Sequence, residues 1–133
     1  MKHLIIGGDG LVGRYLAAEL RSLGEEVLIA DINKSDHELY KDIPFLHLDI
    51  RDRAAFEGIP LAPEDIVHSL AAAMLSPPIP RRQRLETIWS VNCLGVQHLL
   101  DFMESRGASK LIHFSTDMVY GYARTVPIGE DHP

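Results

Sequence analysis

A glycine-rich turn near the start of the chain has the composition of a phosphate-binding loop. The segment Gly7-Gly8-Asp9-Gly10-Leu11-Val12-Gly13 follows a short apolar run and precedes apolar residues at helical spacing. A pyrophosphate needs a tight turn, a backbone free of side chains and the amide-rich start of a helix. Such a turn can also be purely structural, but its position favours binding. We expect the pyrophosphate to be held by Gly7, Gly10, Leu11, Val12 and Gly13.

An acidic residue follows at the distance that a dinucleotide site requires. Asp31 ends an apolar run about 20 residues after the glycine turn, where a carboxylate can accept hydrogen bonds from both hydroxyls of an adenosine ribose. The same charge repels a 2′-phosphate, and no arginine follows directly. The sequence therefore predicts NAD rather than NADP, with the Ile32-Asn33 backbone beside the ribose. The alternative is a solvated acid at a strand end.

Composition limits the classes of protein that fit. The chain has 133 residues, 46% of them apolar, which is enough for one domain with a buried core. Its net charge of −6 disfavours nucleic-acid and membrane-surface partners. The single cysteine, Cys93, excludes an internal disulfide, and we expect a cytoplasmic protein without a signal peptide or membrane span. Seven histidines show no metal-binding spacing, so we expect no metal site.

The apolar pattern alternates between short strands and helices. Short runs that are apolar on both faces predict five buried parallel strands, at 3–6, 27–30, 44–48, 66–70 and 110–114. Helices are expected from 11 to a cap at Gly24, near 53–57 and over 81–106, with a helical turn within 34–41 and loops at 76–80 and after 114. This alternation predicts an α/β doubly wound, Rossmann-like sheet of order 3-2-1-4-5 with helices on both faces. Ligands bind such a sheet at the carboxyl ends of its strands, where the strand order reverses.

The expected helix 81–106 carries an apolar stripe. Its members are Leu85, Ile88, Trp89, Asn92, Val96, Leu99, Leu100 and Met103. We expect Trp89 to belong to the core and Cys93 to be a buried, inert thiol. A second apolar edge of the helix, which includes Val91 and Leu94, is a candidate partner surface, and the basic cluster 81–84 is interpreted as a solvated face.

Several motifs resemble the NAD-dependent epimerase/dehydratase family of extended short-chain dehydrogenases. The segment 6–13 resembles the family's TGxxGxxG signature, with Ile6 in place of threonine. Asp49-Ile50 resembles the acidic turn that meets the adenine. The segment 67–72 resembles the V-x-H-L-A-A element, which implies that Leu70, Ala71 and Ala72 lie along the nicotinamide half; Ser69 stands where the family has histidine. Asn92 with Gly95 matches N-x-x-G, in which the asparagine is a cofactor-side contact.

The segment 114–121 carries the strongest resemblance. Phe114-Ser115-Thr116-Asp117-Met118-Val119-Tyr120-Gly121 is similar to the family's S-S/T-x-x-V-Y-G. The resemblance implies that Ser115 lies on the cofactor side and that Thr116 hydrogen-bonds the reacting sugar oxygen, for which a hydroxyl is suited because it donates and accepts. Dehydratases have a glutamate after the aspartate, whereas this chain has Met118, which disfavours dehydration.

The resemblance implies the NAD-binding part, residues 1–133, of an enzyme that exchanges hydride between NAD and a sugar hydroxyl or ketone. The substrate is expected to be a small molecule, in particular a nucleotide sugar, and a homodimer through helix 81–106 is suggested. The family's catalytic Tyr-x-x-x-Lys would follow Pro133, and Tyr120 is followed at that spacing by Arg124. We therefore expect these residues alone to be inactive, as part of a longer enzyme with a substrate lobe. Alternatives are a non-catalytic NAD-sensing module and a keto-sugar or carbonyl reductase.

Overall fold

The computed structural model describes residues 1–74 and 80–132, and its centre is one parallel sheet. The strand order is β3-β2-β1-β4-β5, and all four neighbouring pairs are parallel, which confirms the predicted doubly wound arrangement. The strands are β1 (Lys2–Ile6), β2 (Glu26–Asp31), β3 (Phe45–His47), β4 (Ile66–Ser69) and β5 (Lys110–His113). Each agrees with its predicted range to within one or two residues.

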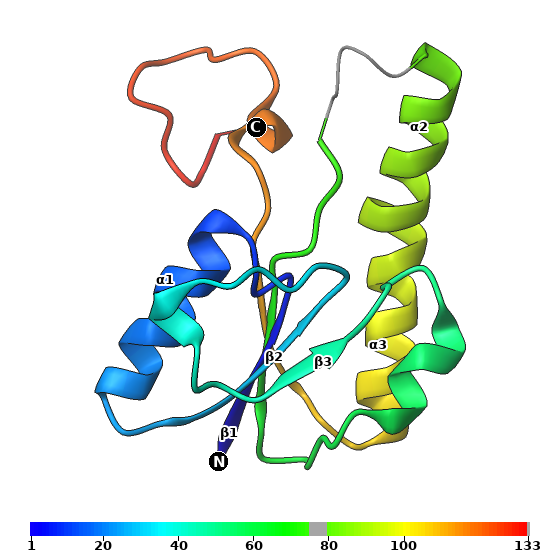
Figure 1. Cartoon of the computed structure of the whole chain (residues 1–133). Helices are drawn as coiled ribbons and strands as arrows, with labels where there is room; N and C mark the ends of the chain where they lie inside the picture. The colour runs from blue at the N-terminus through cyan, green and yellow to red at the C-terminus, as the bar shows by residue number, and fades with distance from the viewer. Residues whose placement is uncertain (75–79, 133) are drawn as a thin grey trace.

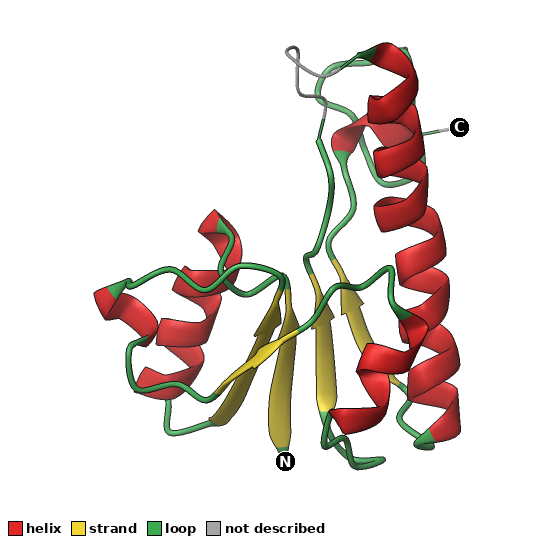
Figure 2. Cartoon of the chain, turned by 45° about the vertical axis from the view of Figure 1, so that its right-hand side comes forward, coloured by secondary structure: helices red, strands yellow, loops and turns green. Residues whose placement is uncertain are grey.

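Helices cover both faces of this sheet. Helix α1 (Leu11–Ser22) lies against one face, and α3 (Val96–Ser105) lies against the other together with the 3₁₀ helix Arg53–Gly58 (Figures 1 and 2). Gly24, with φ of +81°, ends the α1 segment as predicted. No helix formed by residues 1–74 and 80–132 is long and apolar enough to cross a membrane.

The expected helix 81–106 is continuous but not uniform. It consists of α2 (Arg81–Trp89), a π-helical segment (Ser90–Gly95) and α3, and Gly107 follows with φ of +69°. The π segment was not predicted, because the apolar spacing does not distinguish it from an α-helix. π-Helical turns are frequent at functional sites.

Two predictions about this helix are wrong. Trp89 is 62% exposed rather than part of the core, and Cys93 is exposed rather than buried. Trp89 is exposed because α2 extends beyond the carboxyl ends of the strands, where no sheet lies beneath it (Figure 2). Cys93 lies on the exposed side of the π-helical segment, whose Val91 packs against the core. The α3 part packs on the sheet through Leu99, Phe102 and Met103, and Val91 of the π segment packs against the same core.

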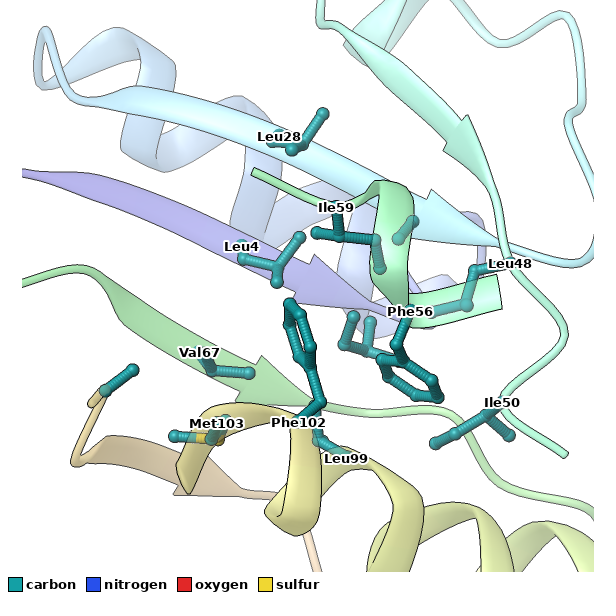
Figure 3. Close-up of a cluster of buried hydrophobic side chains, with 13 residues drawn as sticks. Leu4, Leu28, Leu48, Ile50, Phe56, Ile59, Val67, Leu99, Phe102 and Met103 are labelled. Atoms are coloured by element: carbon teal, nitrogen blue, oxygen red, sulfur yellow. The ribbon is translucent and has the colours of Figure 1, made fainter. Parts of the chain in front are cut away.

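The main core lies between the sheet and the α3 side (Figure 3). Leu4 and Val67 point from the strands toward Phe56 of the 3₁₀ helix and Phe102 of α3. The two phenylalanine rings are tilted, with centroids 5.4 Å apart, an arrangement that adds to the free energy gained by burial. This packing holds α3 and the 3₁₀ helix against the sheet.

The shorter segments agree with the sequence in part. The helical turn expected within 34–41 is the 3₁₀ helix Glu38–Tyr40. A further 3₁₀ turn, Asp117–Tyr120, lies in the segment that was expected to be loop, and the Thr116 side chain caps it by accepting a hydrogen bond from the Met118 N–H. Of the loop predicted over 76–80, residues 76–79 lie outside the described residues.

Two histidines are buried side by side on the α1 face of the sheet. His3 of β1 and His68 of β4 are 7% and 4% exposed, and His3 Nδ1 lies 2.8 Å from His68 Nε2. Glu25 lies 3.7 Å from the far nitrogen of His3. Burial, followed by the proximity of His3, lowers the pKa of His68 to about 4. His68 is therefore neutral in the folded protein at pH 7.

This pair predicts a specific loss of stability in mild acid. The pKa of His68 is about 4 when folded and near 6.5 when unfolded, so the unfolded chain binds the extra proton between these values. As pH falls from 6.5 to 4, the free energy of unfolding should decrease by about 3 kcal/mol through this group. Replacing both rings (His3→Val with His68→Val) should remove this dependence, as measured by urea unfolding at several pH values. The exposed His47→Gln should keep it, and an unchanged pH slope in the double variant would contradict the assignment.

Candidate functional site

A cavity of about 400 Å³ opens at the carboxyl ends of the strands. It lies at the point where the strand order reverses around β1, as expected for a doubly wound sheet. The predicted site residues that line it are Gly7, Gly10, Asp31, Ile32, Asn33, Asp49, Ile50, Leu70, Ala71 and Ala72. Residues from four separate segments of the chain therefore meet around one space.

The other predicted site residues lie outside the lining of this cavity. Leu11 and Val12 are in the first turn of α1 with exposed side chains, and Gly13 is buried within the same turn. Ser115 and Thr116 lie in the exposed segment after β5. Asn92 stands behind one wall of the cavity.

The glycine turn is shaped by two close backbone approaches. Gly7 has φ of +83°, and a Cβ atom there would lie 2.4 Å from the backbone nitrogen of Ala71, beyond β4. A Cβ on Gly13 would lie 2.6 Å from the carbonyl oxygen of Gly7. Neither position can hold a side chain, so α1 and the segment after β4 both approach the turn at backbone distance.

The first turn of α1 is free of competing acceptors. Its N-cap residue, Gly10, supplies no side-chain hydrogen bond, and the first turn contains no acidic residue. The N–H groups at the start of a helix have no partner within the helix, and the helix dipole favours an anion there. This end of α1 therefore has the donors and the field that a pyrophosphate requires.

Asp31 holds the turn and the following loop together. Its Oδ2 accepts a hydrogen bond from the Asp9 N–H at 2.9 Å, and its Oδ1 accepts one from the Asn33 N–H at 3.0 Å. Each carboxylate oxygen can accept a further bond. The carboxylate is thus fixed in orientation at the cavity wall while it retains capacity for a ligand's hydroxyl groups.

Asp49 is paired with a residue that sequence reasoning did not select. Arg51 donates to both carboxylate oxygens of Asp49, with Nε–Oδ1 at 2.9 Å and Nη2–Oδ2 at 2.5 Å. These bonds lower the pKa of Asp49 despite its partial burial. Both residues line the cavity, so its β3 side presents a neutralised ion pair.

Asn92 positions the wall formed by the chain after β4. Its amide accepts a hydrogen bond from the Ala73 N–H at 2.7 Å and donates one to the Ala73 carbonyl at 3.0 Å. Gly95, three residues on, packs against Ile50, where an added Cβ would lie 2.8 Å from Ile50 Cγ2. The N-x-x-G motif therefore connects the π-helical segment to two sides of the cavity.

Several lining residues were not identified from the sequence. They are Ile6, Asp9, Ala30, Leu48, Arg51, Ala73, Thr87 and Val91. Most lie one position before or after a predicted residue, so the predicted strand ends indicated the right segments but not these individual residues. Thr87 and Val91 come from the long helix, and no local signal distinguishes them from its other polar and apolar positions. Within 1–74 and 80–132, no group of three or more His, Cys, Asp or Glu side chains is placed to hold a metal ion.

The sheet order, the glycine turn and the carboxylate at the end of β2 together define a Rossmann-like domain of the dinucleotide-binding type. The chain belongs to the NAD dependent epimerase/dehydratase family, whose model matches residues 3–133.

Individual relatives agree with this family. A UDP-glucose 4-epimerase of Bacillus subtilis is 30% identical over an alignment that covers 100% of this chain and 42% of the relative. A crystal structure of the UDP-glucose-4-epimerase of Stenotrophomonas maltophila, with bound NAD and formylated UDP-arabinopyranose, is 29% identical with a TM-score of 0.80, covering 98% of this chain and 41% of that one. Another UDP-glucose 4-epimerase structure is 25% identical with a TM-score of 0.83, covering 100% of this chain and 41% of that one. The chain spans between 31% and 42% of the length of the curated relatives it matches.

The contact between the turn and β4 predicts that Gly7 tolerates no side chain. Gly7→Ala should lower the free energy of unfolding by about 2–5 kcal/mol, because left-handed strain contributes about 1–2 kcal/mol and overpacking about 1–3 kcal/mol. Urea unfolding followed by circular dichroism measures this. Gly58→Ala is the control, since its added Cβ meets no atom within 4 Å, and it should change stability by less than about 0.5 kcal/mol. Equal effects of the two substitutions would contradict the predicted contact.

Proposed function

We propose that the chain binds NAD in this cavity and forms the cofactor-binding part of an epimerase-type oxidoreductase. The observation that carries the proposal is the convergence of the glycine turn, Asp31 and the ends of β3 and β4 around one cavity at the switch point of the sheet. Family membership supports the same cofactor.

The residues present fit the chemical groups of a dinucleotide. The uncapped start of α1 suits the pyrophosphate, to which Leu11 and Val12 offer their backbone N–H groups. The Gly10 N–H already donates to the Gly7 carbonyl at 3.3 Å, and Gly10 contributes a backbone free of a side chain. The Asp31 carboxylate suits the adenosine ribose, with Ile32 and Asn33 alongside. The Asp49-Ile50 segment suits the adenine.

The segment after β4 suits the nicotinamide half of the dinucleotide. Leu70, Ala71 and Ala72 provide a largely apolar wall there, with Asn92 holding it in place. Bound NAD supplies the hydride acceptor, while this chain's residues bind and orient it.

The substrate that we propose is a nucleotide sugar. Relatives named as UDP-glucose 4-epimerases support this class. Thr116 is the candidate contact to the reacting sugar oxygen: its hydroxyl is exposed and already donates to Asp117 at 3.2 Å. Met118, which has no proton to exchange, favours epimerisation over dehydration. Since the 133 residues contain no Tyr-x-x-x-Lys, we infer that proton transfer requires residues beyond them.

We also infer self-association through the helix 81–106. Its exposed apolar side chains are Leu85 at 53%, Trp89 at 62%, Leu94 at 46% and Leu100 at 43%. Apolar groups of this size, grouped on one helix, are typical of a protein–protein contact. The exposed thiol of Cys93 on the same helix is consistent with a reducing compartment such as the cytoplasm.

The cofactor assignment predicts a defined effect at Asp31. Asp31→Ala should weaken NAD binding by about 1–3 kcal/mol, because charge-assisted hydrogen bonds to the ribose are lost. Isothermal titration calorimetry on the purified chain measures this. Asp42→Asn, which removes an exposed charge from the loop after β2, is the control and should leave the affinity unchanged. Unchanged affinity in Asp31→Ala would refute the ribose assignment, and a wild-type chain that binds no NAD would refute the proposed function.

The self-association predicts a change in native mass. Trp89→Glu should convert a dimer into a monomer in sedimentation equilibrium, because the charge cannot be buried in an apolar contact. Tyr122→Glu, at a residue that is 98% exposed in the C-terminal segment, should leave the dimer intact. A wild-type chain that sediments as a monomer would show that the contact does not form in this chain.

A further inference from the structure

The glycine turn contains a buried carboxylate with three hydrogen bonds. Asp9 is 9% exposed, and its Oδ2 accepts a bond from the Ser35 N–H at 3.0 Å. Its Oδ1 accepts bonds from the Ser35 hydroxyl at 2.5 Å and from the Tyr40 hydroxyl. The two hydroxyl oxygens lie 2.6 Å apart. The loop that follows β2 is thereby fixed to the turn that precedes α1.

The same residue is bonded to Asp31 through its backbone. The Asp9 N–H donates to Asp31, whose other oxygen accepts from the Asn33 N–H. Asp9 therefore connects the glycine turn, the ribose-site carboxylate and residues 33–35. Asp9 and Asp31 both line the cavity, so a second acidic residue lies beside the carboxylate that we propose for the adenosine ribose.

A nearby cation is directed toward Asp9. Arg14 Nη2 donates to the Asp9 carbonyl at 2.6 Å and lies 3.9 Å from its Oδ1. Arg14 Nε is buried and has no partner among residues 1–74 and 80–132. Lys34, the cation that follows in the β2–β3 loop, lies over the ring of Phe45. Both positive groups are thus already engaged by neighbouring protein groups.

The Asp9 carboxylate remains charged in this setting. Burial opposes its ionisation, but hydrogen bonds from Ser35 and Tyr40, together with the charge of Arg14, outweigh burial and lower the pKa of Asp9. A phosphate monoester carries a charge of about −1.5 to −2 at neutral pH. Such a group on the ribose would meet two carboxylates, while Arg14 and Lys34 already contact Asp9 and Phe45.

We propose that Asp9 is a specificity-determining residue for the dinucleotide. Asp9 holds the loop after β2 against Asp31 and engages Arg14. As a result, the site accepts a ribose with a free 2′-hydroxyl and rejects a 2′-phosphate. This inference rests on the proposed dinucleotide binding. The discrimination between NAD and NADP then depends on the Asp9–Ser35–Tyr40 network as well as on Asp31. When Asp9 loses its charge, the positive charge of Arg14 is no longer balanced by the carboxylate 3.9 Å away and favours a phosphate, while its hydrogen bond to the Asp9 carbonyl remains.

The test compares the dissociation constants of NAD and NADP for the full chain by calorimetry. Asp9→Asn keeps an oxygen acceptor for the Ser35 and Tyr40 hydroxyls but removes the charge. It should lower the preference for NAD over NADP at least tenfold, chiefly through tighter NADP binding. Asp36→Asn, at an exposed acid of the same loop, should change the ratio less than twofold.

Further variants separate the role of Arg14 and guard against misfolding. Combining Asp9→Asn with Arg14→Ala should abolish the gain in NADP affinity. Tyr40→Phe, which removes a single hydroxyl, should also lower the preference for NAD over NADP, by a smaller factor. If Asp9→Asn does not fold, this variant tests the proposal in its place. Circular dichroism and urea unfolding establish that each variant is folded.

The outcomes distinguish this inference from the proposed function. The inference alone would be overturned if the wild-type chain binds NAD but Asp9→Asn and Asp36→Asn show the same ratio of NAD to NADP dissociation constants. A wild-type chain that binds neither dinucleotide would overturn the proposed function and this inference with it. A tenfold or greater shift that Arg14→Ala reverses would support both.

Discussion

The structure depends on a contact between two backbones. At Gly7 the chain turns with φ of +83° against the backbone of Ala71, and at Gly13 helix α1 lies directly on the same turn. A methyl group at either position would separate α1 from the sheet or the turn from β4. Because these approaches are made without side chains, the start of α1 and the ends of β1 and β4 surround one space. The cavity is a consequence of this contact.

The sheet order converts the local turn into a site with several walls. β1 is central, with β2 on one side and β4 on the other, so the segments that leave these strands emerge next to the glycine turn. The core between the sheet and α3 holds this helix against the sheet. Beyond the strand ends the long helix continues, and its π segment lines the cavity with Val91 and supports the cavity walls through Asn92 and Gly95. A single packing arrangement thus sets both stability and the position of the binding groups.

Charge at the cavity is organised by pairing. On the β3 side Asp49 is neutralised by Arg51, while at the end of β2 Asp31 is fixed by backbone donors and carries no such partner among the described residues. Asp9 lies beside it with Arg14 directed inward. The negative field therefore concentrates at the position where an adenosine ribose would lie, although the amide-rich start of α1 is nearby. The separation of the amide-rich helix start from the carboxylates suits a ligand with an anionic centre and a hydroxyl-bearing end.

The sequence by itself determined the type and order of the elements, the doubly wound topology and most of the cavity lining. Apolar periodicity and glycine positions are local properties, and in a parallel sheet the strand ends must share one edge. Tertiary structure decided what depends on distant neighbours. Trp89 is exposed because α2 extends beyond the end of the sheet, and Cys93 is exposed because it lies on the outer side of the π segment. His3 and His68 are paired because two neighbouring strands are in register. Asp9 is buried because Ser35 and Tyr40 fold back onto it. Each of these outcomes depends on where chain segments far apart in sequence meet. The spacing of residues along the chain does not encode how close such segments lie in space.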